Sequence, residues 1–133
     1  MPSSKLDAKT IALLKGKNFV FVATLNRDGS PQLTPTWVDT DGKRIIINTA
    51  VGRKKQRNLT RDPRVSLSLY DYSDPYNHIS IDGRVIKQVK GAEAEAHIDK
   101  LSFKYWRKKR YPAHSKDAPR VILVIEPTKI YSR

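Results

Sequence analysis

Short apolar runs and strict apolar–polar alternation dominate the chain, and both patterns are typical of β-strands. Residues 18–25 (NFVFVATL) predict a buried strand, and residues 31–38 and 43–50 predict two more. An Asp-Gly turn separates the first two segments and a second Gly-containing turn separates the next pair, so we expect an antiparallel meander of three strands. Pro35 cannot donate to a strand ladder, which places the second strand at a sheet edge or at a bulge.

The second half of the chain predicts three further strands. Residues 64–71 alternate between apolar and polar positions, and residues 78–89 alternate again after a loop at 72–77. Gly83 interrupts that alternation and predicts a bulge. Residues 120–133 form a last apolar run. Six strands, most of them in consecutive hairpins, predict a mainly β, α+β protein: a small six-stranded antiparallel β-barrel with a few peripheral helices.

Three segments read as helices. Asp7 or Ser4 can cap a first helix that runs to about Lys15, and Gly16 would end it. A short helix is expected after Gly52 and ends before Asp62-Pro63, because the residue before a proline disfavours helical geometry. Residues 91–111 predict a third helix, with Leu101, Tyr105 and Lys108 near one face and with Ile98 and Phe103 flanking them.

Composition sets the class of protein. The 133 residues are 38% apolar, which suits one folded domain over residues 1–133. The chain has no Cys, so disulfides and thiolate chemistry are excluded. The N-terminal segment lacks the apolar core of a signal peptide, and no apolar run approaches the ~20 residues of a membrane span. We therefore expect a cytoplasmic protein.

The formal net charge of +13 is concentrated in two segments. Residues 43–64 hold eight basic residues and one acid, and residues 100–116 hold seven basic residues and no acid, so each segment carries a net charge of +7. Localised charge of this kind predicts a localised anion: a nucleic acid, an anionic membrane or a polyanionic small molecule. The alternative is a solvated basic face with no ligand.

The first basic segment has its cations in an unusual place. Arg53, Lys54, Lys55 and Arg57 lie at the beginning of the short helix, where the helix dipole disfavours positive charge. A docked anion removes that conflict, because free N–H groups and basic side chains together form a phosphate site. Gly52 allows close approach of the backbone.

Residue types for other chemistries are sparse. The three His residues are isolated and give no metal-ligand spacing, and the chain has no G-x-S-x-G elbow, P-loop or G-x-G-x-x-G motif. If a proton donor is needed, His78, Tyr76 and Tyr70 are the candidates. We expect His97 to be an exposed helix residue and His114 to be a loop residue. Trp37 should be core or ring-facing, with core as the default, and Trp106 should pack its helix.

The order of segments carries a family resemblance. A strand, an N-R-D-G turn, Q-L-T-P-T-W-V, the strand I-I-I-N-T-A and then R-K-K-Q-R-N-L-T-R-D-P-R-V-S-L resemble the FMN-binding split-barrel superfamily. Within it, the sequence is most similar to the pyridoxamine 5'-phosphate oxidase-like, coenzyme F-420-dependent reductases. The resemblance covers residues 6–90 well and the last strand loosely, and K-x-R-N-L-x-R-D-P-R is its most specific part.

The resemblance implies a six-stranded split β-barrel, a homodimer and a cofactor groove at the dimer interface. The expected activity is hydride transfer between the reduced deazaflavin, coenzyme F-420, and a conjugated or unsaturated small molecule, with FMN as the alternative cofactor. By the same resemblance, the cofactor phosphate would be held by Arg53, Lys54 and Lys55. The ring would be lined by Thr34, Pro35, Thr36 and Trp37, and the ribityl chain would be flanked by Ile47, Asn48 and Thr49. Arg57 and Asn58 lie one turn further along, and Tyr76, Asn77 and His78 would reach over from the partner subunit.

The second basic segment extends this reading. The deazaflavin cofactor carries a phosphodiester and an oligoglutamate tail, so residues 104–110 (KYWRKKR) form a candidate tail-binding helix. Pyridoxamine phosphate oxidases proper have a longer C-terminal segment with substrate-binding Arg and His residues, so we do not expect oxidation of pyridoxamine phosphate. The other readings are a nucleic-acid-binding barrel, disfavoured because few aromatic residues stand exposed on adjacent strands, and a cofactor carrier without turnover.

Overall fold

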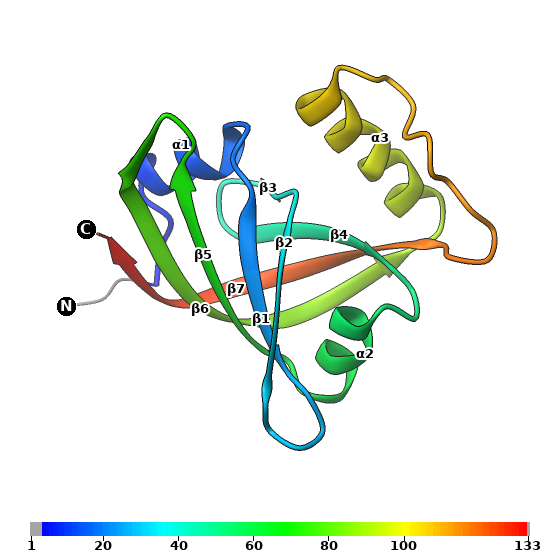
Figure 1. Cartoon of the computed structure of the whole chain (residues 1–133), viewed down its shortest axis with the longest axis horizontal. Coiled ribbons are helices and arrows are strands. Elements are labelled where there is room, and N and C mark those ends of the chain that lie inside the picture. The colour runs from blue at the N-terminus through cyan, green and yellow to red at the C-terminus, as the bar shows by residue number, and fades with distance from the viewer. Residues whose placement is uncertain (1–3, 133) are drawn as a thin grey trace.

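Seven antiparallel strands form one strongly curled sheet, an open half-barrel, in the computed structural model of the chain, which describes residues 4–132 (Figure 1). The sheet order is β2-β1-β5-β6-β7-β4-β3. The strands are β1 (Val20–Leu25), β2 (Pro31–Thr36), β3 (Asp39–Thr40), β4 (Ile45–Ala50), β5 (Arg64–Asp71), β6 (Asp74–Lys90) and β7 (Arg120–Ser132). The helices are α1 (Ala8–Lys15), α2 (Lys54–Arg61) and α3 (Ala92–Trp106).

The expected class, a mainly β protein with a few peripheral helices, is confirmed, and the strand count is seven rather than six because β3 forms a short edge strand of its own. The expected three-strand meander is wrong. β2 is an edge strand, as Pro35 predicts, but β4 pairs with β7 and β3 on the opposite side of the sheet. The fully buried Val38 anchors the crossing segment over the core, so the chain does not turn back beside β2.

The core fills the inside of the curl. Alternate residues of each long strand face inward, and α1 closes one end with Leu13 and Leu14. In β5 the alternation is the predicted one, with Val65, Leu67 and Leu69 buried. The segment 18–25, in contrast, is buried on one face only. Phe19 and Phe21 are 49% and 38% exposed on the outer face, because β1 has solvent rather than a second layer on that side.

A bulge in β6 bends the sheet. The pairing of β6 with β7 shifts register between Asp82 and Gly83 and again between Val85 and Lys87. A Cβ on Gly83 would lie 2.7 Å from the carbonyl oxygen of Glu126, so only glycine fits there. The predicted bulge is therefore confirmed. The predicted loop at 72–77 is shorter than expected, since β6 already begins at Asp74.

The helix ends follow local chemistry. Asp7, not Ser4, caps α1 through a 2.8 Å bond from the N–H of Thr10, and α1 ends at Lys15 as predicted. α3 ends at Trp106, five residues earlier than expected, because Arg107 turns into the left-handed region (φ 61°) and its N–H bonds back to Phe103. Lys108 is consequently exposed beyond the helix and does not share its buried face.

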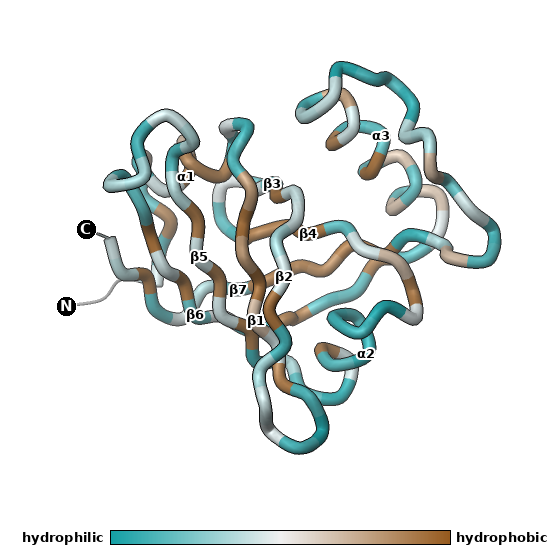
Figure 2. The backbone as a smooth tube through the Cα atoms, in the orientation of Figure 1, coloured by the Kyte–Doolittle hydropathy of each residue, from teal (hydrophilic) through white to brown (hydrophobic). Residues whose placement is uncertain are grey.

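Figure 2 shows α2 and the segment after α3 as largely hydrophilic, beside strands with apolar positions. Among residues 4–132 there is no helix of the length and apolar character that crossing a membrane requires.

Candidate functional site

A groove of about 530 Å³ runs along the seam of the curled sheet, between β2 on one side and β4 on the other. α2 and α3 flank it from opposite ends, as their places in Figure 1 indicate. Its lining consists of Phe19, Gln32, Thr34, Pro35, Thr36, Trp37, Asn48, Thr49, Arg53, Lys54, Lys55, Ile98, Trp106, Tyr111 and Arg120.

Four of these side chains are cations, and none of the lining residues is an acid. Within the described residues, none of the four forms an ion pair with a carboxylate. Burial, together with the nearby charges of Arg53 and Arg120, lowers the pKa of Lys55. The fold thus holds like charges together at a cost in free energy that a bound anion would offset.

The start of α2 adds backbone donors to this charge. The helix begins at Lys54 with no side-chain cap from Arg53 and with no acid in its first turn. Polar contacts fix it in place, since the N–H of Gly52 donates to the Gln56 side chain at 2.9 Å and the Asn58 amide donates to Thr24 at 3.0 Å. The N-terminus of α2 is therefore open toward the groove and favourable for an anion.

Arg120 is a site residue that the sequence analysis missed. It opens β7, is 8% exposed, and donates from Nε to Oδ1 of Asn48 at 2.9 Å. Its guanidinium also lies over the Tyr111 ring, 5.2 Å from the centroid. A single Arg before an apolar run carries no distinguishing pattern, and its partner Asn48 is 72 positions away, so no local signal marks it.

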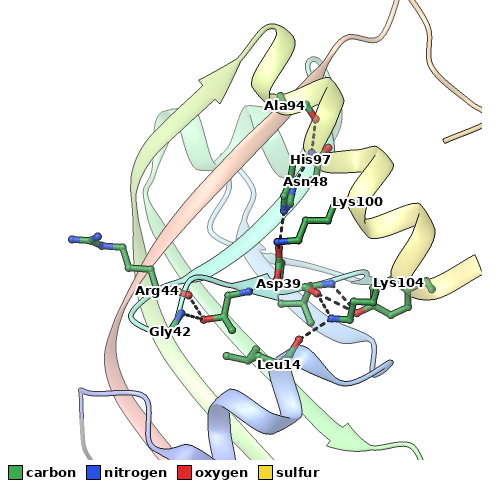
Figure 3. Close-up of polar contacts among 12 residues, drawn as sticks. Leu14, Asp39, Gly42, Arg44, Asn48, Ala94, His97, Lys100 and Lys104 are labelled. Atoms are coloured by element: carbon green, nitrogen blue, oxygen red, sulfur yellow. Dashed lines mark hydrogen bonds and ion pairs between the residues drawn. The ribbon is translucent and has the colours of Figure 1, made fainter. Parts of the chain in front are cut away.

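Asn48 connects Arg120 to a buried polar chain beneath α3. Figure 3 shows the part of this chain that Asn48, Ala94, His97 and Asp39 form. The amide nitrogen of Asn48 donates to the carbonyl oxygen of Ala94 at 3.0 Å and lies 3.1 Å from Nδ1 of His97. The other ring nitrogen of His97 lies 3.0 Å from Asp39. The expectation that His97 is an exposed helix residue is wrong: its side chain is 11% exposed because it faces the sheet from α3.

Asp39 is the acidic end of that chain. Burial raises its pKa, but bonds from His97 and the N–H of Thr40, with the charge of Lys100, outweigh burial and keep the pKa well below its usual range. Lys104, one turn further along α3, donates to the carbonyl oxygens of Leu14 and Val38 at 2.9 and 2.7 Å. Burial lowers the pKa of Lys104 to about 8.

An aromatic pocket of about 740 Å³ adjoins the groove and shares Phe19, Pro35, Trp37 and Trp106 with it. Trp37 is half-buried, not core: it stacks on Tyr105 with ring centroids 5.1 Å apart, and Trp106 meets it edge-on at 4.5 Å. The hydroxyl of Tyr105 donates to the carbonyl oxygen of Asn18 and accepts from the N–H of Val38. This wall of the pocket is therefore fixed by hydrogen bonds as well as by stacking.

A basic loop, residues 107–119, follows α3 and borders the groove. Tyr111 lines the groove, and four cations precede it at residues 107–110. His114 anchors the loop, since its two ring nitrogens lie 2.7 Å from Glu95 and 2.6 Å from Asp99. The hydrogen bond to Asp99 is the main reason that the pKa of His114 is raised. His114 is thus a loop residue, as expected, but one with a specific structural role.

The structure brings together nine of the residues that the resemblance assigns to the cofactor: Thr34, Pro35, Thr36, Trp37, Asn48, Thr49, Arg53, Lys54 and Lys55. Ile47 points into the core and is fully buried. Asn58 is buried against the β1–β2 turn, and Arg57 lies on α2 outside the groove lining. Tyr76, Asn77 and His78 lie at the β5–β6 hairpin, away from this chain's own groove.

Residues 4–132 contain no group of three His, Cys, Asp or Glu side chains arranged to hold a metal ion.

Comparison with known proteins places this geometry in a family. A solved structure named as an F420 reductase shares 29% identity, with a TM-score of 0.81 over 90% of this chain and 94% of that one. A conserved hypothetical protein of Mycobacterium tuberculosis (24% identity, TM-score 0.75, 99% of this chain and 88% of that one) and the general stress protein 26 of Bacillus anthracis (18%, 0.70, 93% and 90%) share the fold.

The family model described as pyridoxamine 5'-phosphate oxidase matches residues 6–133, which is nearly the whole chain. The chain therefore belongs to the pyridoxamine 5'-phosphate oxidase family.

Proposed function

We propose that the protein is a coenzyme F-420-dependent oxidoreductase that transfers a hydride between the reduced deazaflavin and a conjugated or unsaturated small molecule. The observation that carries the proposal is a groove with four cations and no acid in its lining, continuous with an aromatic pocket. The similarity to a structure named as an F420 reductase supports the same choice.

The residues present fit an anionic cofactor with a planar ring. Its phosphate would be held by Arg53, Lys54 and Lys55 with the N-terminus of α2, and Arg120 would add a fourth positive charge. Its ring would lie along β2, where Thr34 has a buried hydroxyl oxygen without a hydrogen-bond partner among the described residues. Asn48 and Thr49 would flank the chain between the ring and the phosphate.

When bound, the reduced deazaflavin supplies the hydride, and the protein supplies position and polarity. The aromatic pocket offers the substrate flat apolar surfaces on Phe19, Trp37 and Trp106, which favour a conjugated ring system and exclude water from it. Tyr70 lines that pocket, so it is the best placed of the three candidate proton donors.

The oligoglutamate tail of the cofactor would leave the groove across the basic loop. Trp106 and Tyr111 both line the groove, and Arg107, Lys108, Lys109 and Arg110 lie between them in sequence. The tail site is therefore the turn and loop after α3, and not a helix through residue 110, because α3 ends at Trp106.

We further propose that the working unit is a homodimer. The outer face of β2, β1 and β5 exposes Phe19, Phe21, Leu33 and Tyr70, at 49%, 38%, 64% and 40% of their surface. A contiguous apolar face of this kind favours a second copy. Tyr76, Asn77 and His78 do not line their own groove, so in this proposal they would reach a cofactor from the partner subunit.

The test is a fluorescence titration of the purified protein with coenzyme F-420 and with FMN, each at two salt concentrations. We expect tight, salt-sensitive binding of the deazaflavin and weaker binding of FMN. Preference for FMN would indicate flavin chemistry instead. Binding of neither cofactor would reject a cofactor role, and the basic segments would then be either a nucleic-acid surface or a solvated face. Deazaflavin that binds tightly but gives no turnover with any conjugated substrate would identify a carrier.

The tail site is tested by charge reversal of Lys108, Lys109 and Arg110. These variants should weaken binding of long-tailed cofactor and spare a short-tailed form, because the short form does not reach the loop. Equal losses for both forms would reject the tail assignment.

A further inference from the structure

The amide of Asn48 has only one orientation that satisfies its neighbours. Its oxygen accepts from Nε of Arg120, and its nitrogen donates to the carbonyl oxygen of Ala94. If the amide were reversed, two donors would face each other at Arg120 and two acceptors at Ala94. Both contacts are buried, so reversal would leave unpaired polar groups inside the protein.

This orientation determines the proton position on His97. The second N–H of the Asn48 amide points at Nδ1 of His97, 3.1 Å away, so Nδ1 must accept and carries no proton. The ring proton is therefore on Nε2 and is donated to Asp39 at 3.0 Å. Asp39 in turn accepts from the N–H of Thr40 and pairs with Lys100, which keeps it a carboxylate.

We propose that His97, as the neutral Nε2–H tautomer held by Asp39, is a positioning residue for the groove: it fixes Asn48, and Asn48 fixes the Arg120 guanidinium against the bound anion. The Arg120 guanidinium has no opposite charge to hold it in place, since it faces the like charge of Arg53 and pairs with no carboxylate among the described residues. Its side-chain hydrogen bonds go to Oδ1 and to the backbone oxygen of Asn48, at 2.9 and 3.3 Å.

These bonds hold the Arg120 guanidinium in its binding position from the side of the protein interior, before any ligand is bound. Asp39 comes from β3, His97 from α3, Asn48 from β4 and Arg120 from β7, so one chain of bonds joins four elements and ends in the groove. Without the Nδ1 acceptor, the second N–H of the Asn48 amide loses its partner, and only Ala94 and Arg120 itself still hold the amide. The guanidinium keeps its contacts with the backbone oxygen of Asn48 and the Tyr111 ring, but its Oδ1 partner is less firmly held. It then samples more directions, and part of the binding free energy is lost to ordering it.

The inference rests on the proposed function in that the anion is the cofactor phosphate, but its first test needs no cofactor. In uniformly ¹⁵N-labelled protein, NMR distinguishes a protonated from an unprotonated ring nitrogen of His97. We expect Nε2 protonated and Nδ1 bare at neutral pH. We also expect a slowly exchanging Nε–H signal from Arg120 in the wild type. A protonated Nδ1 would overturn the proposal whatever the protein binds.

Two variants separate positioning from simple docking of α3. His97→Asn places a carbonyl oxygen close to the position of Nδ1 and can still accept from Asn48, whereas His97→Leu cannot. We expect His97→Leu to weaken cofactor binding on the order of tenfold and to speed exchange of the Arg120 Nε–H, and His97→Asn to restore most of both. Equal behaviour of the two variants would reject the proposal.

The matched control is Leu101→Ala, which loosens α3 through a side chain that is 1% exposed and lies outside the polar chain. It should lower the melting temperature while leaving the Arg120 Nε–H protected. If it reproduces the His97→Leu effects, His97 acts through helix docking and the proposal fails. Failure of the proposed function has a different signature: wild-type protein would bind neither deazaflavin nor FMN, while the tautomer and Nε–H results would stand.

Discussion

Replacing Lys55 with Met should change stability and binding in opposite directions. In the free protein Lys55 is a half-buried cation near Arg53 and Arg120, and burial with those charges lowers its pKa. A lowered lysine pKa means that the folded state disfavours the charged form, so at neutral pH the charge costs stability. Removing it should raise the melting temperature of the free protein.

The gain in melting temperature should depend on pH. Because the pKa of Lys55 is lower in the folded state, the cost is fully present below that lowered pKa and disappears as the pH rises toward the ordinary lysine value. The gain in melting temperature for Lys55→Met should therefore be largest near neutral pH and shrink in alkaline buffer.

Binding should respond the other way. A charge-assisted hydrogen bond to a phosphate contributes about 1.5–3 kcal/mol, so Lys55→Met should weaken cofactor binding by about tenfold to a hundredfold. The assay is fluorescence titration beside differential scanning calorimetry of the same preparations. Lys43→Met, which removes an exposed charge outside the groove, is the matched control and should change neither quantity appreciably. A Lys55→Met protein that binds as the wild type, or that melts at a lower temperature, would refute the reasoning.

The remaining predictions concern the supports of the site. The pKa of His114 is raised, so its stabilising contribution is fully present below its unfolded pKa of 6.5 and is lost as the pH rises through the folded pKa. His114→Gln should remove that part of the pH dependence of the urea midpoint, whereas the control His78→Gln should leave it in place. If the urea midpoints of wild type and His114→Gln vary with pH in parallel, Glu95 and Asp99 do not anchor His114 as described. Tyr105→Phe should cost about 1–3 kcal/mol of unfolding free energy in urea titrations, because it leaves the carbonyl oxygen of Asn18 and the N–H of Val38 unpaired in the interior. Tyr131→Phe, at a side chain 47% exposed, is its control and should stay within about 0.5 kcal/mol of wild type; a loss below that limit for Tyr105→Phe would mean that water replaces both bonds.

Local patterns predicted most single elements of the fold. The alternation in β5, the Asp-Gly turn after β1, the edge position of β2 and the Gly83 bulge depend on residues a few positions apart, and each is found as expected. The partner of β4 could not be found in this way. Ile47 pairs with Leu123, and any of several apolar strands would have satisfied the same local pattern.

The candidate site likewise contains residues that the local sequence reveals and residues that it does not. Arg53, Lys54 and Lys55 are visible because they are consecutive and stand where a helix begins. Arg120 and His97 are not visible, because their roles depend on contacts across 72 and 58 positions. Their environment also reverses the expectation from composition: His97 lies in a polar stretch typical of a solvated helix face, yet it completes a buried chain.

The curl of the sheet sets the width of the groove. The groove lies between β2 and β4, which are first and sixth in the sheet order and share no hydrogen bonds. Its width therefore depends on the curvature that accumulates over the strands between them, and the β6 bulge at Gly83 contributes to that curvature. We therefore expect substitutions in β6 and β7 that change this curvature to alter ligand preference, even at residues that line no part of the groove.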